Sequence, residues 1–303
     1  MREAKNTVFI EGILSEINLE ERVYEKEDGT KVNSITGHIV VRVETEINKE
    51  PKVLEIPVYF FQNEYTKKGK NNPVFENNKN IKDNFVSIAA CGDVNAADKV
   101  RISSGKIQMN EYWKGEDSLV SYPRIYATFV NRVKSEDFKP AAKFQTEMVV
   151  QNIIDEVDKE GIETGRLKIK GIVPGWGNRV SVFPYVAQAP GVVNGIRQYW
   201  QVGDTVEAIG NLNFSTEVQI LQEKIGFGDV VEKKRTHNVS ELVITGGNDV
   251  PLSDELIFDI EEIKQGLADR EIYLQGLKNK KSEKKANFRH APTESSFADK
   301  YGF

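Results

Sequence analysis

The sequence predicts a mainly β protein made of two small five-stranded barrels in tandem, followed by an amphipathic helix and a flexible tail. At 303 residues the chain is long enough for two domains that each bury a core. Five short segments recur in the same order in the two halves, and apolar and polar residues alternate along them. Such alternation is typical of strands with one buried face, and five strands of this kind suit a small closed barrel. The matched segments are 8–17 with 148–157, 36–43 with 164–171, 53–59 with 180–186, 100–109 with 206–214, and 124–133 with 240–245.

Prolines and glycines align within this repeat. The first pair of segments matches without gaps at its apolar positions, and the second pair keeps a Thr-Gly start. The third pair is aligned by Pro57 and Pro184, and proline inside a strand predicts a sheet edge or a bulge. In the fourth pair a one-residue offset precedes Gly105 and Gly210, which predicts a bulge beside each glycine. Any two β domains share alternating residues, but five matches in one order favour a duplicated unit.

Changes of composition suggest where the domains begin and end. Residues 1–133 are expected to form the first barrel and residues 144–247 the second, with a polar linker at 134–143. The first barrel carries a long insert at 62–84 between its third and fourth strands, which we expect to be a surface loop.

The pattern becomes helical after the second barrel. Ser253 is expected to cap a helix within residues 248–278. Residues 279–303 are polar without a periodic apolar face, which predicts a disordered tail. The apolar residues that predict the helix, spaced by three or four, are Leu256, Ile260, Ile263 and Leu267.

Charge and composition narrow the function. The formal net charge of −5 argues against a protein that coats duplex DNA with a globally basic surface, although a local basic groove is compatible with it. No apolar run approaches the ~20 residues that span a bilayer, so we expect a cytoplasmic protein without membrane contact. Cys91 is the single cysteine, and the three histidines are scattered, so neither a metal nor another cofactor is expected.

Two segments resemble a known family. Residues 202–212, Val-Gly-Asp-Thr-Val-Glu-Ala-Ile-Gly-Asn-Leu, resemble the Gly-Asp-x-Val-x-x-x-Gly-x-Leu run common in OB-fold single-stranded DNA-binding proteins. Residues 6–14 are similar to the first strand of that family. The resemblance is to the phage and bacterial type, with the tandem arrangement closer to phage or replication protein A-type members, and it covers about 6–133 and 144–246.

The resemblance implies a protein that coats and protects single-stranded DNA during DNA replication, recombination or repair, in the host cytoplasm if it is phage-encoded. Family tails dock replication or recombination proteins, which would make Phe297, Tyr301 and Phe303 the partner-binding residues here. The acidic cluster that ends such tails is missing from this chain. The Lys-rich start of the tail is an alternative source of phosphate contacts.

In an OB-fold the ligand lies across the outer face of strands two and three. In the second barrel, Arg166, Lys168 and Lys170 alternate with apolar residues on strand two, and we call these three residues the basic stripe. The matching positions of the first barrel include His38 and Arg42. The second barrel is therefore expected to be the main binding platform.

Aromatic residues are expected beside these cations. Trp176 lies in a glycine-containing turn, where it would stack on a base while Arg179 contacts phosphate. Alternation places Tyr59 and Phe61 outward and Phe60 in the core. The remaining expected contacts are Tyr185, Trp113, and the insert lysines Lys67, Lys68 and Lys70.

The side to which Tyr185 points is left open by two conflicting arguments. The alternation from Ser181 places Tyr185 outward, which we favour, whereas the alignment of the prolines places it inward. More generally, a basic stripe is often only a solvated strand face, and an aromatic residue is often a packing residue.

An enzyme and a protein-interaction module are the two alternatives to a DNA-binding protein. The sequence has no Gly-rich phosphate loop with lysine, no His-Glu zinc motif and no nucleophile elbow, so we expect no enzyme. A metal-dependent nuclease with scattered aspartates has no motif to support it. The alternative is an OB-type structural or protein-interaction module, such as a phage assembly component, because a fold does not determine a function.

Overall fold

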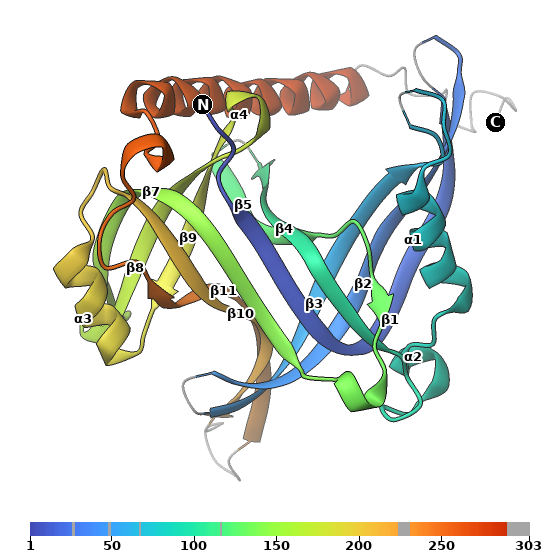
Figure 1. Cartoon of the computed structure of the whole chain (residues 1–303), viewed down its shortest axis with the longest axis horizontal. Helices are drawn as coiled ribbons and strands as arrows, with labels where there is room; N and C mark the ends of the chain where they lie inside the picture. The colour runs from blue at the N-terminus through green and yellow to red at the C-terminus, as the bar shows by residue number, and fades with distance from the viewer. Residues whose placement is uncertain (26–27, 48–49, 67, 116, 224–230, 290–303) are drawn as a thin grey trace, which may run out of the picture.

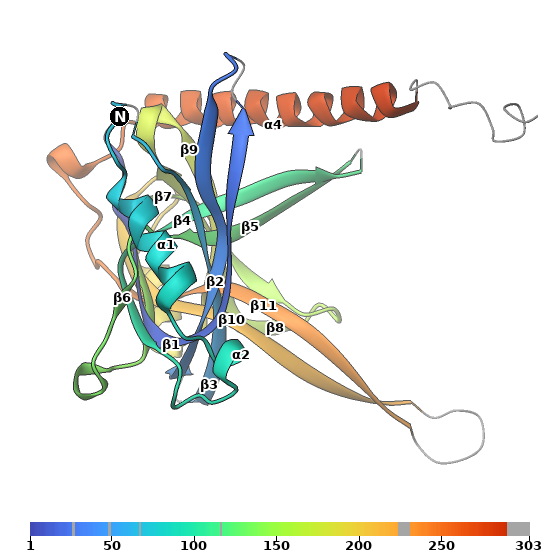
Figure 2. The same ribbon diagram turned by 90° about the vertical axis from the view of Figure 1, so that its right-hand side faces the viewer.

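The computed structural model describes residues 1–25, 28–47, 50–66, 68–115, 117–223 and 231–289. Within this part of the chain the main strands form one 11-stranded mixed sheet that closes on itself twice (Figures 1 and 2).

The first ring contains five strands. Strand β1 pairs with β2 and β4, β3 pairs with β2 and β5, and β4 pairs with β5, which closes the ring. The β3–β5 pair is parallel and the other pairs are antiparallel. The strands are β1 (Asn6–Glu25), β2 (Lys31–Ile47), β3 (Glu50–Asn63), β4 (Lys99–Lys114) and β5 (Ser118–Tyr126).

The second ring repeats the same pairing order. Strand β7 pairs with β8 and β10, β9 pairs with β8 and β11, and β10 pairs with β11; here too the third and fifth strands form the parallel pair. The repeat found in the sequence is therefore a repeat of strand pairing. The strands are β7 (Ala141–Val157), β8 (Glu163–Pro174), β9 (Val180–Ala187), β10 (Thr205–Glu223) and β11 (Val231–Gly247).

The two aligned prolines occupy equivalent places. Pro57 is followed by Val58, which begins the short parallel pairing with β5, and Pro184 is followed by Tyr185, which begins the pairing with β11. Each proline lies within the antiparallel ladder with the second strand of its ring and one residue before the parallel ladder with the fifth strand. Irregularities in register also lie beside Gly105 and at Gly210, as the one-residue offset predicts.

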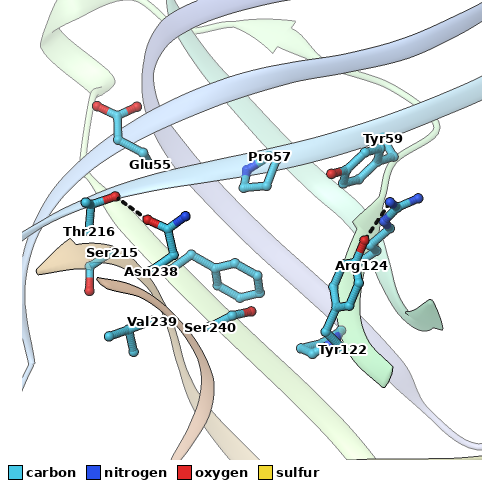
Figure 3. Close-up of a pocket in the computed structure, with 12 residues that line it drawn as sticks. Glu55, Pro57, Tyr59, Tyr122, Arg124, Ser215, Thr216, Asn238, Val239 and Ser240 are labelled. Atoms are coloured by element: carbon cyan, nitrogen blue, oxygen red, sulfur yellow. Dashed lines mark hydrogen bonds between the residues drawn. The ribbon is translucent and has the colours of Figure 1, made fainter. Parts of the chain in front are cut away.

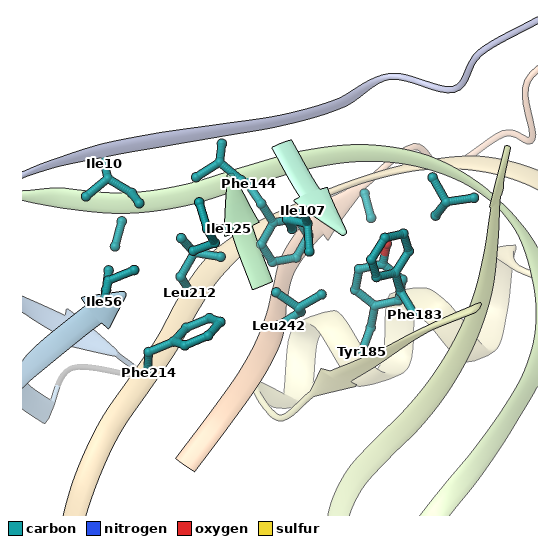
Figure 4. Close-up of a cluster of buried hydrophobic side chains, with 14 of the residues drawn as sticks. Ile10, Ile56, Ile107, Ile125, Phe144, Phe183, Tyr185, Leu212, Phe214 and Leu242 are labelled. Carbon is teal, nitrogen blue, oxygen red and sulfur yellow. The ribbon is translucent and has the colours of Figure 1, made fainter. Parts of the chain in front are cut away.

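The two rings share strand pairing and a core. Residues Asn6–Glu11 of β1 pair with Ala141–Thr146 of β7, which joins the rings into one sheet. Buried side chains from both halves pack in one hydrophobic cluster, including Ile10 and Ile125 from the first ring and Phe144 and Leu212 from the second (Figure 4). The stretch 134–143, expected as a linker, contains the 3-10 turn η1 (Ser135–Asp137) and the first residues of β7.

The fifth strand of the first ring is displaced from its predicted position. The sequence predicts 124–133, but β5 ends at Tyr126, and only the short β6 (Asn131–Arg132) follows, paired with β4. Between them, the side chain of Asn77 binds the backbone of Val130, accepting from its N–H at 3.2 Å and donating to its carbonyl at 3.4 Å. At Val130 the backbone therefore bonds to the side chain of Asn77, where the alternation of residues predicted pairing with a neighbouring strand.

The insert at 62–84 is not only a surface loop. Its second half is helix α1 (Pro73–Asn84), which continues into α2 (Ile88–Cys91). Asn72 caps α1 by accepting from Val74 N at 3.1 Å, and Phe75 and Ile81 are buried. Helix α3 (Pro190–Tyr199) occupies the same place in the second half, between β9 and β10.

The C-terminal helix begins later and extends further than predicted. After the short η3 (Asp254–Leu256), α4 (Ile260–Arg289) begins beside Asp259, whose carboxylate accepts from the N–H groups of Glu261 and Glu262. Asp259 therefore caps the helix in place of Ser253. The tail predicted from 279 starts as helix, and Phe297, Tyr301 and Phe303 lie outside the described residues.

Helix α4 lies along one end of both rings and contacts β4 and β9 (Figure 1). Among the described residues, no helix combines the length and the apolar character needed to cross a membrane.

Candidate nucleic-acid interface

A groove lies where the outer face of the first ring meets the β10–β11 hairpin of the second (Figure 3). It encloses about 260 Å³ and is open to solvent at one side. We call it the tyrosine groove. Its lining residues are Glu55, Pro57, Tyr59, Tyr122, Pro123, Arg124, Phe214, Ser215, Thr216, Asn238, Val239 and Ser240.

Arg124 is stacked between two tyrosine rings of this groove. Its guanidinium carbon lies 4.5 Å from the ring centroid of Tyr59 and 5.3 Å from that of Tyr122. Its Nη2 donates to the Tyr122 hydroxyl at 2.7 Å (Figure 3). Burial opposes the charge, but hydrogen bonds with the hydroxyls of Tyr122 and Tyr126 outweigh it, so the pKa of Arg124 is raised. Within the described part of the chain, no carboxylate forms an ion pair with this arginine.

The register of three strands extends the aromatic surface. His38 on β2 is opposite Tyr59 on β3, and Tyr59 is opposite Tyr126 on β5, so the three rings stand in one row. Their centroids are 5.4 Å and 5.9 Å apart. Phe61 is 57% exposed, while Phe60 is buried. The predicted orientations of Tyr59, Phe60 and Phe61 are thus confirmed.

A carboxylate marks the other end of the groove. Glu55 faces Arg42, whose Nη1 lies 3.7 Å from the carboxylate, and Arg42 also pairs with Glu44 at 3.0 Å. Burial raises the pKa of Glu55, and its Oε2 is buried without a hydrogen-bond partner among the described residues. The charge of Arg42 is therefore shared by two acids, and Glu55 is held in a setting that disfavours its ionised form.

Lys168 and Lys170 of the basic stripe are exposed and Arg166 is half-buried, and most of the charge of the stripe is paired. Glu156 on β7 binds Lys168 at 3.1 Å and Arg166 at 3.3 Å, and Arg166 also binds Glu241 at 2.6 Å. Burial of Glu156 opposes its charge, but hydrogen bonds from Lys168 and Thr164 outweigh burial and lower its pKa. Among the described residues, only Lys170 of the stripe lacks an ion pair.

Trp176 and Arg179 lie apart from the basic stripe. Trp176, in the turn η2 (Trp176–Asn178), is 81% exposed, and Arg179 is exposed beside it. Trp176 is six positions after Lys170, and the four positions from Lys170 to the end of β8 at Pro174 already span roughly 13 Å. Ile172 and Pro174, at the next two alternate positions of β8, are buried. The structure therefore does not join the tryptophan and the stripe into one surface.

Tyr185 points inward, so the favoured outward orientation is wrong. The side chain is 2% exposed, its ring packs against Phe144 and Phe183, and its hydroxyl lies 3.4 Å from Thr146 Oγ1. Burial raises the pKa of this hydroxyl. Gly171 on the adjacent strand leaves the space for its ring, because a Cβ there would lie 2.9 Å from Tyr185. The proline alignment gave the correct orientation.

Trp113 is a packing residue rather than part of an open surface. Its Nε1 donates to the carbonyl of Leu274 on α4 at 2.8 Å, and the Lys278 ammonium lies 4.9 Å from its ring centroid. Lys68 and Lys70 are exposed in the turn that follows β3, whereas Lys67 lies outside the described residues.

Two residues that line the groove, Tyr122 and Arg124, were missed in the sequence, together with Tyr126 beside Tyr59. Tyr122, Arg124 and Tyr126 occupy alternate positions of β5 and therefore share one face. The Tyr-x-Arg-x-Tyr spacing is visible in the sequence, but placing the fifth strand at 124–133 excluded Tyr122 and left this face unexamined.

The YorF family model matches residues 5–280. A search of the curated proteins found no match. The chain is similar in structure to a deletion mutant of the single-stranded DNA binding protein from Thermus aquaticus, with 10% sequence identity and a TM-score of 0.48, over 86% of this chain and 100% of that chain. For the wild-type protein of that organism the identity is 9% and the TM-score 0.47, over 84% of this chain and 95% of that chain. Because the family model spans most of its length, the chain belongs to the YorF family.

Proposed function

We propose that this chain is a single-stranded DNA-binding protein and that each ring is an OB-type barrel, the two being domains joined at 134–143. The observation that carries this proposal is the placement of Arg124 between Tyr59 and Tyr122 in an open groove. The groove lies on the outer face of β3, between β5 and the β10–β11 hairpin. Strand β3 is one of the two strands whose outer face OB-folds use for oligonucleotides.

The chemistry of the groove favours a single strand over a duplex. Tyrosine rings stack on bases of any sequence, with about 1–3 kcal/mol per base, but the bases of a duplex are already stacked on each other. No carboxylate in the described chain forms an ion pair with Arg124, so its positive charge remains available to attract a phosphate. With a net charge of −5, the protein depends on such local cations for affinity.

The first ring is the main platform in this proposal, and the second ring extends it. Lys170, Trp176 and Arg179 supply further exposed contacts on the second ring. A protein of this kind would coat and protect single-stranded DNA during replication, recombination or repair, while its C-terminal tail would engage other proteins of these processes.

Fluorescence anisotropy with a labelled oligonucleotide, as a single strand and as a duplex, tests the proposal across a salt series. We expect tight, salt-sensitive binding of the single strand with little sequence preference, and much weaker binding of the duplex. Equal affinity for the duplex, or no binding at low salt, would contradict it. The second result is the one expected of a protein-interaction module.

A further inference from the structure

A second cavity lies at the seam where the two rings join. It measures about 490 Å³, and we call it the seam cavity. Residues of β1, β2 and β4 from the first ring, of β7 and β10 from the second ring, and of the segment before β7 line this cavity. Its lining includes Phe9, Glu11, Arg101, Lys139, Lys143 and Asn211.

The acid of this cavity is already neutralised. Glu11 is 1% exposed, accepts from Arg101 Nε at 2.6 Å and accepts from the backbone N–H of Lys139 at 2.6 Å. The ammonium groups of Lys139 and Lys143 add two positive charges to the lining. Lys143 is exposed and forms no ion pair with any described residue. The lining therefore has an excess of positive charge, which suits an anion.

Strand register places an aromatic ring and an amide beside Lys143. Lys143 on β7 is opposite Phe9 on β1 and opposite Asn211 on β10, so these three residues form a row across the seam. Phe9 is half-buried and contributes to the wall of the cavity. A cation flanked by a phenyl ring and an amide matches the phosphate and the base of one nucleotide.

Strand β10 connects the two cavities. Asn211 lines the seam cavity, and Ser215, four residues further along β10, lines the tyrosine groove, a separation of roughly 13 Å. Between them Asn213 is buried, and β3 packs against β10 (Figure 1). The buried Asn213 and the packing of β3 on β10 close the direct path between the two cavities, so a ligand must be long to occupy both.

We infer that the seam cavity holds the phosphodiester backbone of the same single strand that the tyrosine groove binds, through Lys139 and Lys143. The inference rests on the proposed function and adds a site that engages only long strands. The inferred ligand is single-stranded DNA. A free phosphate ion would bind the same lysines and is the alternative that the test distinguishes.

The test compares oligothymidylates of about 6 and about 30 nucleotides on wild type and on the double variant K139E/K143E. For the long oligonucleotide we expect affinity to fall about tenfold or more and the salt slope to decrease by about 1.4, because two phosphate contacts are lost. Affinity for the short oligonucleotide should stay unchanged. The control K106E/K264E, which makes the same change of charge at exposed lysines outside both cavities, should not discriminate by length.

Four other results would overturn the inference, and each has a different meaning. If both lengths bind the double variant as they bind wild type, the seam cavity takes no part, although the tyrosine groove stands. Equal weakening of both lengths indicates a general electrostatic effect. If wild type binds inorganic pyrophosphate and the double variant does not, while the two proteins bind both lengths equally, the cavity is a free-phosphate site. If wild type binds neither length, the proposed function fails with the inference.

Discussion

The guanidinium carbon of Arg124 lies 4.5 Å from the ring centroid of Tyr59, and no carboxylate in the described chain neutralises that arginine. The same guanidinium donates a hydrogen bond to the Tyr122 hydroxyl, which fixes its orientation. The pair therefore offers a fixed positive charge and an aromatic face within one groove.

Replacement of Arg124 should weaken single-stranded DNA binding without unfolding the protein. We expect Arg124→Ala to lower affinity about tenfold, and Arg124→Lys to restore only part of it, because lysine keeps the charge but not the planar fork. Anisotropy titrations measure both. Arg197→Ala, on the exposed face of α3, is the matched control. Wild-type affinity in Arg124→Ala would remove this residue from the site.

The sequence predicts those features of the fold and the site that depend on local alternation of apolar and polar residues. Period-two alternation and repeat matching located nine of ten ring strands, because alternation reports directly on which face is buried. The same alternation predicted that Tyr59 and Phe61 point outward. The alignment of the prolines correctly predicted that Tyr185 points inward, whereas the alternation from Ser181 predicted the opposite.

The other features depend on contacts between distant segments. The pairing of Glu156 with Arg166 and Lys168 offsets part of the charge of a stripe that looks basic in the sequence. The side chain of Asn77 binds the backbone of Val130, in the stretch where the sequence predicted a continuous strand at 124–133. Trp113 is covered by a helix more than 140 residues away in sequence, as its hydrogen bond with Leu274 shows. None of these contacts has a local sequence signature.

Tyr59 should contribute through its ring rather than through charge. We expect Tyr59→Ala to lose about 1–3 kcal/mol of binding free energy for a stacked base, with an unchanged salt slope. Tyr59→Phe should stay close to wild type, since the ring remains. Tyr273→Ala, at an exposed tyrosine on α4, controls for loss of surface aromatic area. A Tyr59→Ala variant whose salt slope flattens would instead indicate an electrostatic role.

Glu55 should make binding depend on pH. Burial raises its pKa above 4.5, so its carboxylate is protonated over a higher pH range than in the unfolded chain. As pH rises through that pKa, the groove gains negative charge and affinity for DNA should fall, and ionisation should also disfavour the fold. Glu55→Gln should bind more tightly at pH 7 and should flatten this part of the pH profile. The difference between the two profiles isolates Glu55, and parallel profiles would exclude it from the groove.

The basic stripe should contribute unequally. Lys168 is held by Glu156, whereas Lys170 forms no ion pair among the described residues. Lys170→Ala should therefore lower affinity a few-fold and reduce the salt slope by about 0.7, while Lys168→Ala should change both less. Titrations at several salt concentrations distinguish the two variants. A larger effect of Lys168→Ala would show that its ion pair opens for DNA.

Gly171 should be intolerant of a side chain. A Cβ at this position would lie 2.1 Å from Met148 Sδ and 2.9 Å from the Tyr185 ring. We expect Gly171→Ala to lower the free energy of unfolding by about 1–3 kcal/mol, measured by denaturant titration. Gly276→Ala, which meets open space on helix α4, should raise it by up to about 1 kcal/mol. Equal stability of the two variants would contradict the inward packing of Tyr185.

The most direct test of the tyrosine groove is photo-crosslinking to an oligonucleotide that carries 5-iodouracil, followed by peptide mapping. The label reacts with aromatic rings on which it stacks, so we expect crosslinks at Tyr59 or Tyr122 that disappear in Arg124→Ala. Crosslinks confined to Trp176 of the second ring, or their persistence at the same yield in Arg124→Ala, would contradict a binding site built around Arg124.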